Sequence, residues 1–86
     1  MIKSFADKET EKVYRQEFSK RLPQSIQKLA LRKLIMIDNA EKLEDLWVPP
    51  GNRQGQYSIR INDQFRICFK STGKDFEQVE ITDYHS

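Results

Sequence analysis

The feature that most constrains the fold is a pair of alternating apolar runs, 57–61 and 65–69. The apolar positions are Tyr57, Ile59, Ile61, Phe65, Ile67 and Phe69. Because side chains alternate across a strand, a slip of one residue would turn the whole apolar set to solvent. The two sets share a face only if the connecting loop has an odd number of residues, and the loop 62–64 meets this condition. The pattern therefore predicts an antiparallel hairpin with one apolar face.

The same alternation assigns the intervening polar residues to the opposite face of the hairpin. Around a three-residue loop, Arg60 lies directly across from Arg66, and Ser58 lies across from Cys68. Two arginines that face each other in this way destabilise the pair by a few tenths to about 1 kcal/mol. We therefore expect a nearby acidic group or an anionic ligand to offset the repulsion.

A third run of strand character, about 77–83, extends the sheet. Val79 and Ile81 belong to its apolar face. The face that it shares with the arginines carries Glu80, Thr82 and, if the strand continues, Tyr84. Depending on the register, Glu80 could neutralise Arg66 without any ligand.

Helical patterns occupy the first half of the chain. A short alternating start, 2–5, could form a strand, and Asp7 is an expected N-cap for a helix over about 8–19. Pro23 fits the first turn of a second helix that continues to about Asn39. The apolar residues at helical spacing are Val13, Tyr14 and Phe18 in the first helix and Ile26, Leu29, Ala30, Leu34 and Ile37 in the second.

Between the helices and the strands, the segment 41–56 keeps neither pattern. Pro49, Pro50 and Gly51 cannot continue a helix, so we expect a connector here. Helices followed by an antiparallel meander predict an α/β chain of the α+β type, in which two N-terminal helices pack on a small antiparallel β-sheet.

Length and composition fit a single domain spanning residues 1–86. The apolar stretches are far shorter than the roughly 20 residues of a membrane-spanning helix, and the N-terminus lacks the apolar run of a secretory signal. We therefore expect a cytoplasmic location and no membrane partner. Cys68 is the only cysteine, which excludes an internal disulfide and favours a structural thiol. The net charge of +2 permits an anionic partner such as nucleic acid without demanding one.

Several basic residues could bind phosphate. Arg60 and Arg66 form the strongest pair of candidates, because guanidinium groups offer multidentate donors and stay charged at any working pH. Arg53, Lys70 and Lys74 could extend this basic surface. The competing interpretation is a set of ordinary surface charges, partly paired with the acidic group of the third strand.

The last strand runs into Asp83, Tyr84 and His85, so a carboxylate, a phenol and the only imidazole are adjacent. These groups suit proton transfer, although a tyrosine with a pKa near ~10 needs a cationic neighbour to act as a base. A lone histidine near a chain end is more often simply solvated, so both interpretations stay open. The sequence has no glycine-rich phosphate loop, no His/Cys metal-ligand spacing and no Gly-x-Ser-x-Gly turn.

Three segments together resemble the HigB branch of the RelE-like toxins. They are Leu-Trp-Val-Pro-Pro-Gly-Asn-Arg at 46–53, Gln-Tyr-Ser-Ile-Arg-Ile-Asn-Asp-Gln-Phe-Arg-Ile-Cys-Phe at 56–69 and Val-Glu-Ile-Thr-Asp-Tyr-His at 79–85. Arg-Lys-Leu at 32–34 and Asp-Asn-Ala at 38–40 fit as well. The resemblance covers nearly the whole chain and implies a RelE-like fold of the microbial ribonuclease type.

In function, the resemblance implies a toxin of a type II toxin–antitoxin system that acts as a ribosome-dependent messenger RNA endonuclease. The implied partners are the ribosomal A site with its messenger RNA, a HigA-type helix-turn-helix antitoxin, and operator DNA through the antitoxin complex only. No cofactor or metal is implied. The RNA 2′-hydroxyl attacks the adjacent phosphate and leaves a 2′,3′-cyclic phosphate and a 5′-hydroxyl.

The resemblance also suggests roles for individual residues. Arg66 matches the arginine that contacts the scissile phosphate, with Arg60 assisting it. Asp83, Tyr84 and His85 match the catalytic segment, and we expect His85 and Tyr84 to transfer protons without choosing which is the base. The other basic residues expected at the RNA are Arg53, Lys70 and Lys74.

The chain departs from the family pattern after Arg53. Members usually continue with Leu-Glu-Ala-Leu-Lys-Gly-Asp-Arg before the glycine that leads into the strand, whereas Gln54 follows directly here. About eight residues are therefore absent, either through a true deletion, which should weaken or abolish cleavage, or because the sequence as written omits a loop. We favour the omitted loop, because the flanks resume in register. Phe65 and Trp47 also stand where the family pattern has Trp and Arg.

Two alternatives to the nuclease remain open. One is a non-enzymatic toxin of the RelE/ParE fold that binds gyrase, since fold alone does not fix function. The other is a loop-deleted, inactive form that still binds its antitoxin.

Overall fold

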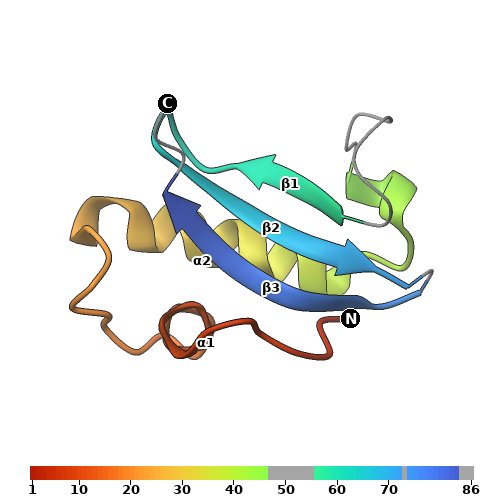
Figure 1. Ribbon diagram of the computed structural model, residues 1–86, viewed down its shortest axis with the longest axis horizontal. Coiled ribbons are helices and arrows are strands. Elements are labelled where there is room, and N and C mark those ends of the chain that lie inside the picture. Colours follow the sequence, from red (N-terminus) through yellow and green to blue (C-terminus); the bar gives the residue numbers. More distant parts are fainter. Residues whose placement is uncertain (47–55, 73, 84–86) are drawn as a thin grey trace.

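Helices and an antiparallel sheet form two layers in the computed structural model, which describes residues 1–46, 56–72 and 74–83 (Figure 1). The elements are α1 (Lys8–Tyr14), α2 (Gln24–Asn39), the 3₁₀ helix η1 (Leu43–Leu46), β1 (Gln56–Arg60), β2 (Phe65–Ser71) and β3 (Phe76–Asp83). The strands lie in the order β1-β2-β3, and both neighbouring pairs are antiparallel. α2 crosses one face of this sheet and α1 lies beside β3 (Figure 1). The expected α+β class is confirmed.

The register of the hairpin is the one that alternation predicts. Arg60 pairs with Arg66 and Ser58 with Cys68. The apolar faces of β2 and β3 pack against α2, and the buried core residues of these elements are Ile26, Ala30, Leu34, Ile37, Phe65, Ile67, Phe69, Phe76, Val79 and Ile81. Phe76, which is fully buried, lies one residue before the expected start of the third strand.

The first helix is shorter than the sequence pattern predicts. Asp7 caps it as expected, because its Oδ1 accepts the backbone N–H of Thr10 at 2.7 Å. The helix ends at Tyr14 rather than near residue 19, so Phe18, which was expected in the apolar stripe, is 60% exposed. The expected end of the first helix was therefore wrong.

The early end of α1 has a local cause at Gln16, whose φ is 64°. The backbone N–H of Gln16 donates to the carbonyl of Val13 at 3.0 Å, and that of Glu17 donates to the carbonyl of Lys12 at 2.8 Å. These are the two hydrogen bonds of a Schellman motif, in which the left-handed residue is usually glycine. Because glutamine has no special preference for this conformation, the sequence does not predict that the helix ends here.

The second helix is confirmed within one residue at its start. Pro23 is the residue before the first helical residue rather than a member of the first turn, and it forms no side-chain cap. Leu29, which the helical pattern assigned to the apolar face, is 42% exposed.

The outer edge of β3 is paired with the N-terminal segment 1–6. Isolated parallel bridges join Ile2 to Phe76 and Phe5 to Val79, so the expected strand over 2–5 is reduced to two bridges. Beyond this segment, the fully buried Thr10 of α1 continues the edge, because its Oγ1 accepts the N–H of Ile81 at 2.8 Å.

Asp38 of α2 ties α2 to α1 and to the N-terminal segment. Its Oδ1 accepts the N–H of Ile2 at 2.9 Å, and its Oδ2 accepts the hydroxyl of Tyr14 at 2.7 Å. Burial opposes ionisation of Asp38, but these two bonds and the nearby N-terminal ammonium hold its pKa below the ordinary value. The same bond to Asp38, together with burial, raises the pKa of Tyr14.

A bulge interrupts the pairing of β2 with β3. Cys68 lies opposite Glu80 and Lys70 lies opposite Glu77, so two residues of β3 occupy the space opposite the single residue between them on β2. The extra residue is Gln78, whose φ is 57°. This geometry resembles the type of bulge in which a left-handed residue comes first.

Candidate functional site

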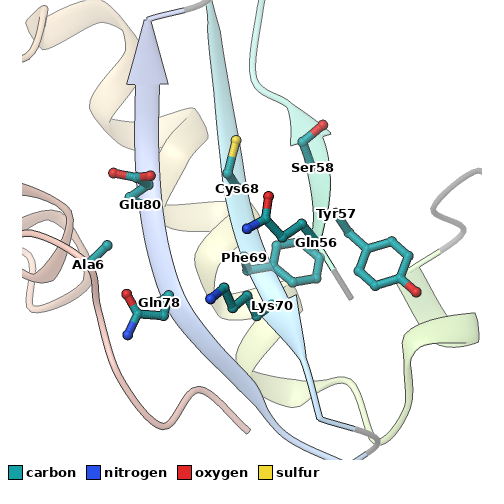
Figure 2. Close-up of a pocket in the computed structure, with 9 residues that line it drawn as sticks. All are labelled: Ala6, Gln56, Tyr57, Ser58, Cys68, Phe69, Lys70, Gln78 and Glu80. Atoms are coloured by element: carbon teal, nitrogen blue, oxygen red, sulfur yellow. The ribbon is translucent and has the colours of Figure 1, made fainter. Parts of the chain in front are cut away.

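The polar face of the sheet, which is opposite α2, contains a hollow of about 500 Å³. Its lining comes from all three strands and from the N-terminal segment (Figure 2). The lining residues are Ala6, Gln56, Tyr57, Ser58, Cys68, Phe69, Lys70, Gln78 and Glu80. Because the apolar face is packed on the core, this is the face on which the alternating polar side chains meet.

Arg66 is half-buried and lies two residues along β2 from Cys68, which lines the hollow. Its Nη1 donates to Ser58 Oγ at 3.3 Å, so the guanidinium reaches across the sheet toward a residue that lines the hollow. On its other side, Thr82 is its partner in the register, and Thr82 Oγ1 donates to the Arg66 carbonyl at 3.4 Å. Arg66 is thus held by both neighbouring strands.

Arg60 lies across from Arg66, but its guanidinium binds groups of the hairpin turn. Its guanidinium forms an ion pair with Asp63, and its Nε donates to the Asn62 carbonyl at 3.2 Å. The acidic group that offsets the arginine pair is therefore Asp63 in the hairpin turn. Glu80, proposed for this role from the sequence, lies across from Cys68.

Asp83 ends β3 at the same end of the sheet as Arg66. It is exposed, lies opposite Phe65 in the register, and accepts a hydrogen bond from Gln64 Nε2 at 3.3 Å. Tyr84, His85 and Arg53 are outside the described residues.

The two candidate lysines lie away from the arginine end. Lys70 is exposed and borders the hollow four residues along β2 from Arg66, about 13 Å at the usual rise of a strand. Lys74 is in the turn after β2 and lines a second hollow, which includes Asp38 and Asp75. The structure therefore brings Arg60, Arg66 and Asp83 to one end of the sheet and separates Lys74 from them. By alternation, Asp83 belongs to the face of its partner Phe65, opposite the two arginines.

Of the residues that line the main hollow, only Lys70 was a site candidate from the sequence, and two polar ones, Gln56 and Gln78, were not assigned to the polar face at all. Gln56 was assigned to the connector, although it fits the polar face by alternation with Ser58. Gln78 faces the hollow beside a bulge whose position depends on pairing across the sheet, so local sequence carries no signal for it.

Comparison with known proteins assigns the chain to a family. Residues 3–85 match the HigB-like toxin family, described as the RelE-like toxin of the type II toxin–antitoxin system HigB. The chain belongs to the HigB-like toxins. It is 39% identical to Toxin HigB-1 of Vibrio cholerae over an alignment of 79 positions, gaps included, which covers 81% of this chain and 83% of that protein. An uncharacterized protein of Haemophilus influenzae is 32% identical over an alignment of 74 positions, which covers 77% of this chain and 72% of that protein.

Membership confirms the resemblance drawn from the hairpin and the terminal segment. It also implies that this HigB-like toxin has an antitoxin partner, because the family belongs to type II toxin–antitoxin systems. No helix in the described ranges is long and apolar enough to cross a membrane.

Proposed function

We propose that this HigB-like toxin is a ribosome-dependent endonuclease that cuts messenger RNA. The observation that carries the proposal is Arg66, which is half-buried on the polar face, donates to Ser58 and lies two residues along β2 from Cys68, which lines the hollow. A fixed guanidinium close to a hollow suits a phosphate, because its planar donors can bind two oxygens at once. Membership of the HigB-like toxin family also supports an endoribonuclease activity.

In the proposed reaction, the RNA 2′-oxygen forms a bond to the adjacent phosphorus and the bond from phosphorus to the 5′-oxygen breaks. Arg66 stabilises the charge that develops on the phosphorane, which a preorganised donor does at little reorganisation cost. One proton leaves the 2′-hydroxyl and one reaches the departing 5′-oxygen. On the basis of the resemblance, we assign these transfers to His85 and Tyr84, with Asp83 as the third member of the segment.

The basic residues around the site take supporting roles in this proposal. Arg53, Arg60, Lys70 and Lys74 would contact the RNA backbone, which generally supplies charge-dependent affinity. Arg60 would have to exchange Asp63 for a phosphate, whereas Lys70 already borders the hollow. The proposed setting is the cytoplasm, with a HigA-type antitoxin as the inhibitor and operator DNA bound only through their complex.

We further infer that the chain lacks about eight residues of the family pattern after Arg53. The lengths of the alignments support this. Since 81% of 86 residues is about 70, an alignment over 79 positions with Toxin HigB-1 includes about nine at which this chain has no residue. Intact mass of the protein from its native gene separates the two explanations of this gap, because a mass near 10.2 kDa means a true deletion and a larger mass means a loop outside this sequence.

The test of the nuclease is expression of two variants, Arg66→Ala and His85→Ala. Both should abolish growth arrest and the codon-positioned cuts in messenger RNA, while binding to the antitoxin persists. Arg32→Ala is the matched control, because Arg32 is an exposed arginine on α2, on the other side of the sheet from the hollow. Persistence of cuts in both site variants would refute the assignment.

The gap after Arg53 is also the reason to keep a second candidate, a toxin that acts by protein binding alone. In that case the wild-type chain should leave messenger RNA intact. Induction of DNA-damage signalling would then point to gyrase, and growth without arrest to an inactive form that binds only its antitoxin.

A further inference from the structure

Four polar side chains line the main hollow without an intramolecular hydrogen bond or ion pair to any other described residue. They are Gln56, Lys70, Gln78 and Glu80. Figure 2 shows Gln56 on β1, Lys70 on β2, and Gln78 and Glu80 on β3. Elsewhere on the same face, polar side chains are engaged, as Ser58 is with Arg66. Donors and acceptors gathered in a hollow and left available are the usual means by which a protein orients a polar ligand.

The charges in this part of the hollow do not favour a phosphate. Lys70 stands across from Glu77, and Glu80 occupies the next pair along β2 and β3. Carboxylates therefore match or outnumber the cation here, in contrast to the arginine end. A carboxylate is an acceptor only, so Glu80 calls for a ligand edge that carries N–H donors.

The distance along the sheet from Arg66 to Glu80 fits the distance from a phosphate of an RNA strand to the base of the same nucleotide. Arg66 pairs with Thr82, and Cys68 pairs with Glu80 two residues further along. Two residues of a strand span about 7 Å. A base attached to a nucleotide whose phosphate lies at Arg66 can therefore reach Glu80.

Gln78 adds a second polar group beside Glu80 through the bulge. Its φ of 57° lies in the left-handed region, which is unfavourable for a residue with a side chain. Bulges commonly re-aim a side chain next to a site, and strain of this kind persists where the surroundings impose it. Gln16 also has a positive φ, 64°, at the end of α1, away from the hollow, and so provides a natural comparison.

We propose that this hollow is a nucleobase site that selects guanine, with Glu80 and Gln78 as the reading residues. The proposal rests on the nuclease function above and deepens it. The two oxygens of Glu80 accept the ring N1–H and the 2-amino group of guanine, and the amide of Gln78 donates to its O6. Guanine alone presents two adjacent donors on this edge. Adenine, cytosine and uracil each place an acceptor where a carboxylate oxygen would repel it, and a site built to bind hydrogen-bond donors discriminates against ligands that lack them.

The first test is an NMR titration of the full chain with the four nucleoside 5′-monophosphates and with inorganic phosphate. GMP should bind at least about ten-fold more tightly than UMP, the usual discrimination of a good bidentate pair. The chemical-shift changes caused by GMP should centre on Ser58, Cys68 and Glu80. Inorganic phosphate should change the shifts of Arg60 and Arg66 only. Equal affinity for all four nucleotides, or shifts confined to residues outside the hollow, would overturn the proposal.

Variants sharpen the test. Glu80→Gln replaces one acceptor oxygen by a donor, so it should remove the preference for GMP while leaving the binding of phosphate unchanged. Gln78→Gly should weaken GMP binding even though it relieves backbone strain. Gln16→Gly relieves the same strain at α1 and should leave GMP binding as in the wild type. A Glu80→Gln chain that still prefers GMP would contradict the assignment.

Mapping of RNA cuts separates this proposal from the nuclease on which it rests. Glu80→Gln should shift the codons that are cut away from guanine. If Arg66→Ala abolishes cleavage while Glu80→Gln cuts the same codons as the wild type, the base site is wrong and the nuclease stands. If GMP binds selectively but the wild-type chain cuts no RNA, the nuclease is wrong and the base site stands.

Discussion

Substitution of Thr10 by valine should destabilise the protein, because it removes the hydrogen-bond acceptor of one buried backbone N–H, that of Ile81. Thr10 is fully buried, and its Oγ1 accepts the N–H of Ile81 at 2.8 Å. Valine replaces this hydroxyl by a methyl group of similar size, and threonine and valine have similar helix propensities. The main change is therefore a buried N–H that loses its acceptor, which costs about 1–3 kcal/mol.

A loss of this size is large for a domain of 86 residues. Each 1 kcal/mol corresponds to about 4–8 °C in the unfolding midpoint at this size, so Thr10→Val should lower the midpoint by at least about 4 °C. Urea unfolding gives the free energy, and amide hydrogen exchange reports on Ile81 directly. The exchange of this amide should accelerate beyond the change expected from global stability alone.

Thr10→Ser is the matched control because it keeps the hydroxyl. It removes one buried methyl group, which costs about 0.8 kcal/mol, but it should preserve the protection of the Ile81 amide. A Thr10→Val chain with the wild-type midpoint and a protected Ile81 amide would refute the role given to this hydrogen bond.

Two further predictions concern a helix end and a carboxylate. Gln16→Gly should raise the free energy of unfolding by about 1 kcal/mol, because glycine adopts the positive φ without a steric penalty. Urea denaturation at neutral pH measures this free energy, and a decrease would contradict the Schellman ending of α1. The pKa of Asp38 is lower in the folded chain, so its contribution is present above the unfolded pKa and is lost as pH falls through the folded pKa. Asp38→Asn should therefore lower stability at neutral pH and flatten its decline in acid, and parallel pH profiles of unfolding for the two chains would contradict this.

Local pattern predicted those parts of the fold in which neighbouring residues decide the outcome. The three-residue turn and the alternation around it set the pairing of Arg60 with Arg66, and Asp7 marked the start of α1. The end of α1 was missed because Gln16 occupies a position that usually signals itself by glycine. The pairing of Glu80 was left open because the turn after β2 and the bulge at Gln78 together fix it.

The candidate site divides in the same way. Alternation alone predicted that Arg66 lies on the polar face, and the ion pair that draws Arg60 away lies within its own turn. Lys74 lies apart because the turn after β2 carries it to the hollow near Asp38. Charge in the sequence identified candidates, whereas the course of the chain decided which of them share a surface.

The outer edge of the sheet and the main hollow are coupled through the bulge. The N–H of Gln78 donates to Ser4 Oγ at 3.0 Å, and the N–H of Val79 donates to the Ser4 carbonyl at 3.1 Å. Ser4 therefore holds the strained residue from the edge while the Gln78 side chain lines the hollow. Strained geometry persists only while its surroundings impose it. The backbone of Gln78 at the hollow is thus held by the N-terminal segment, through a serine that does not itself line the hollow.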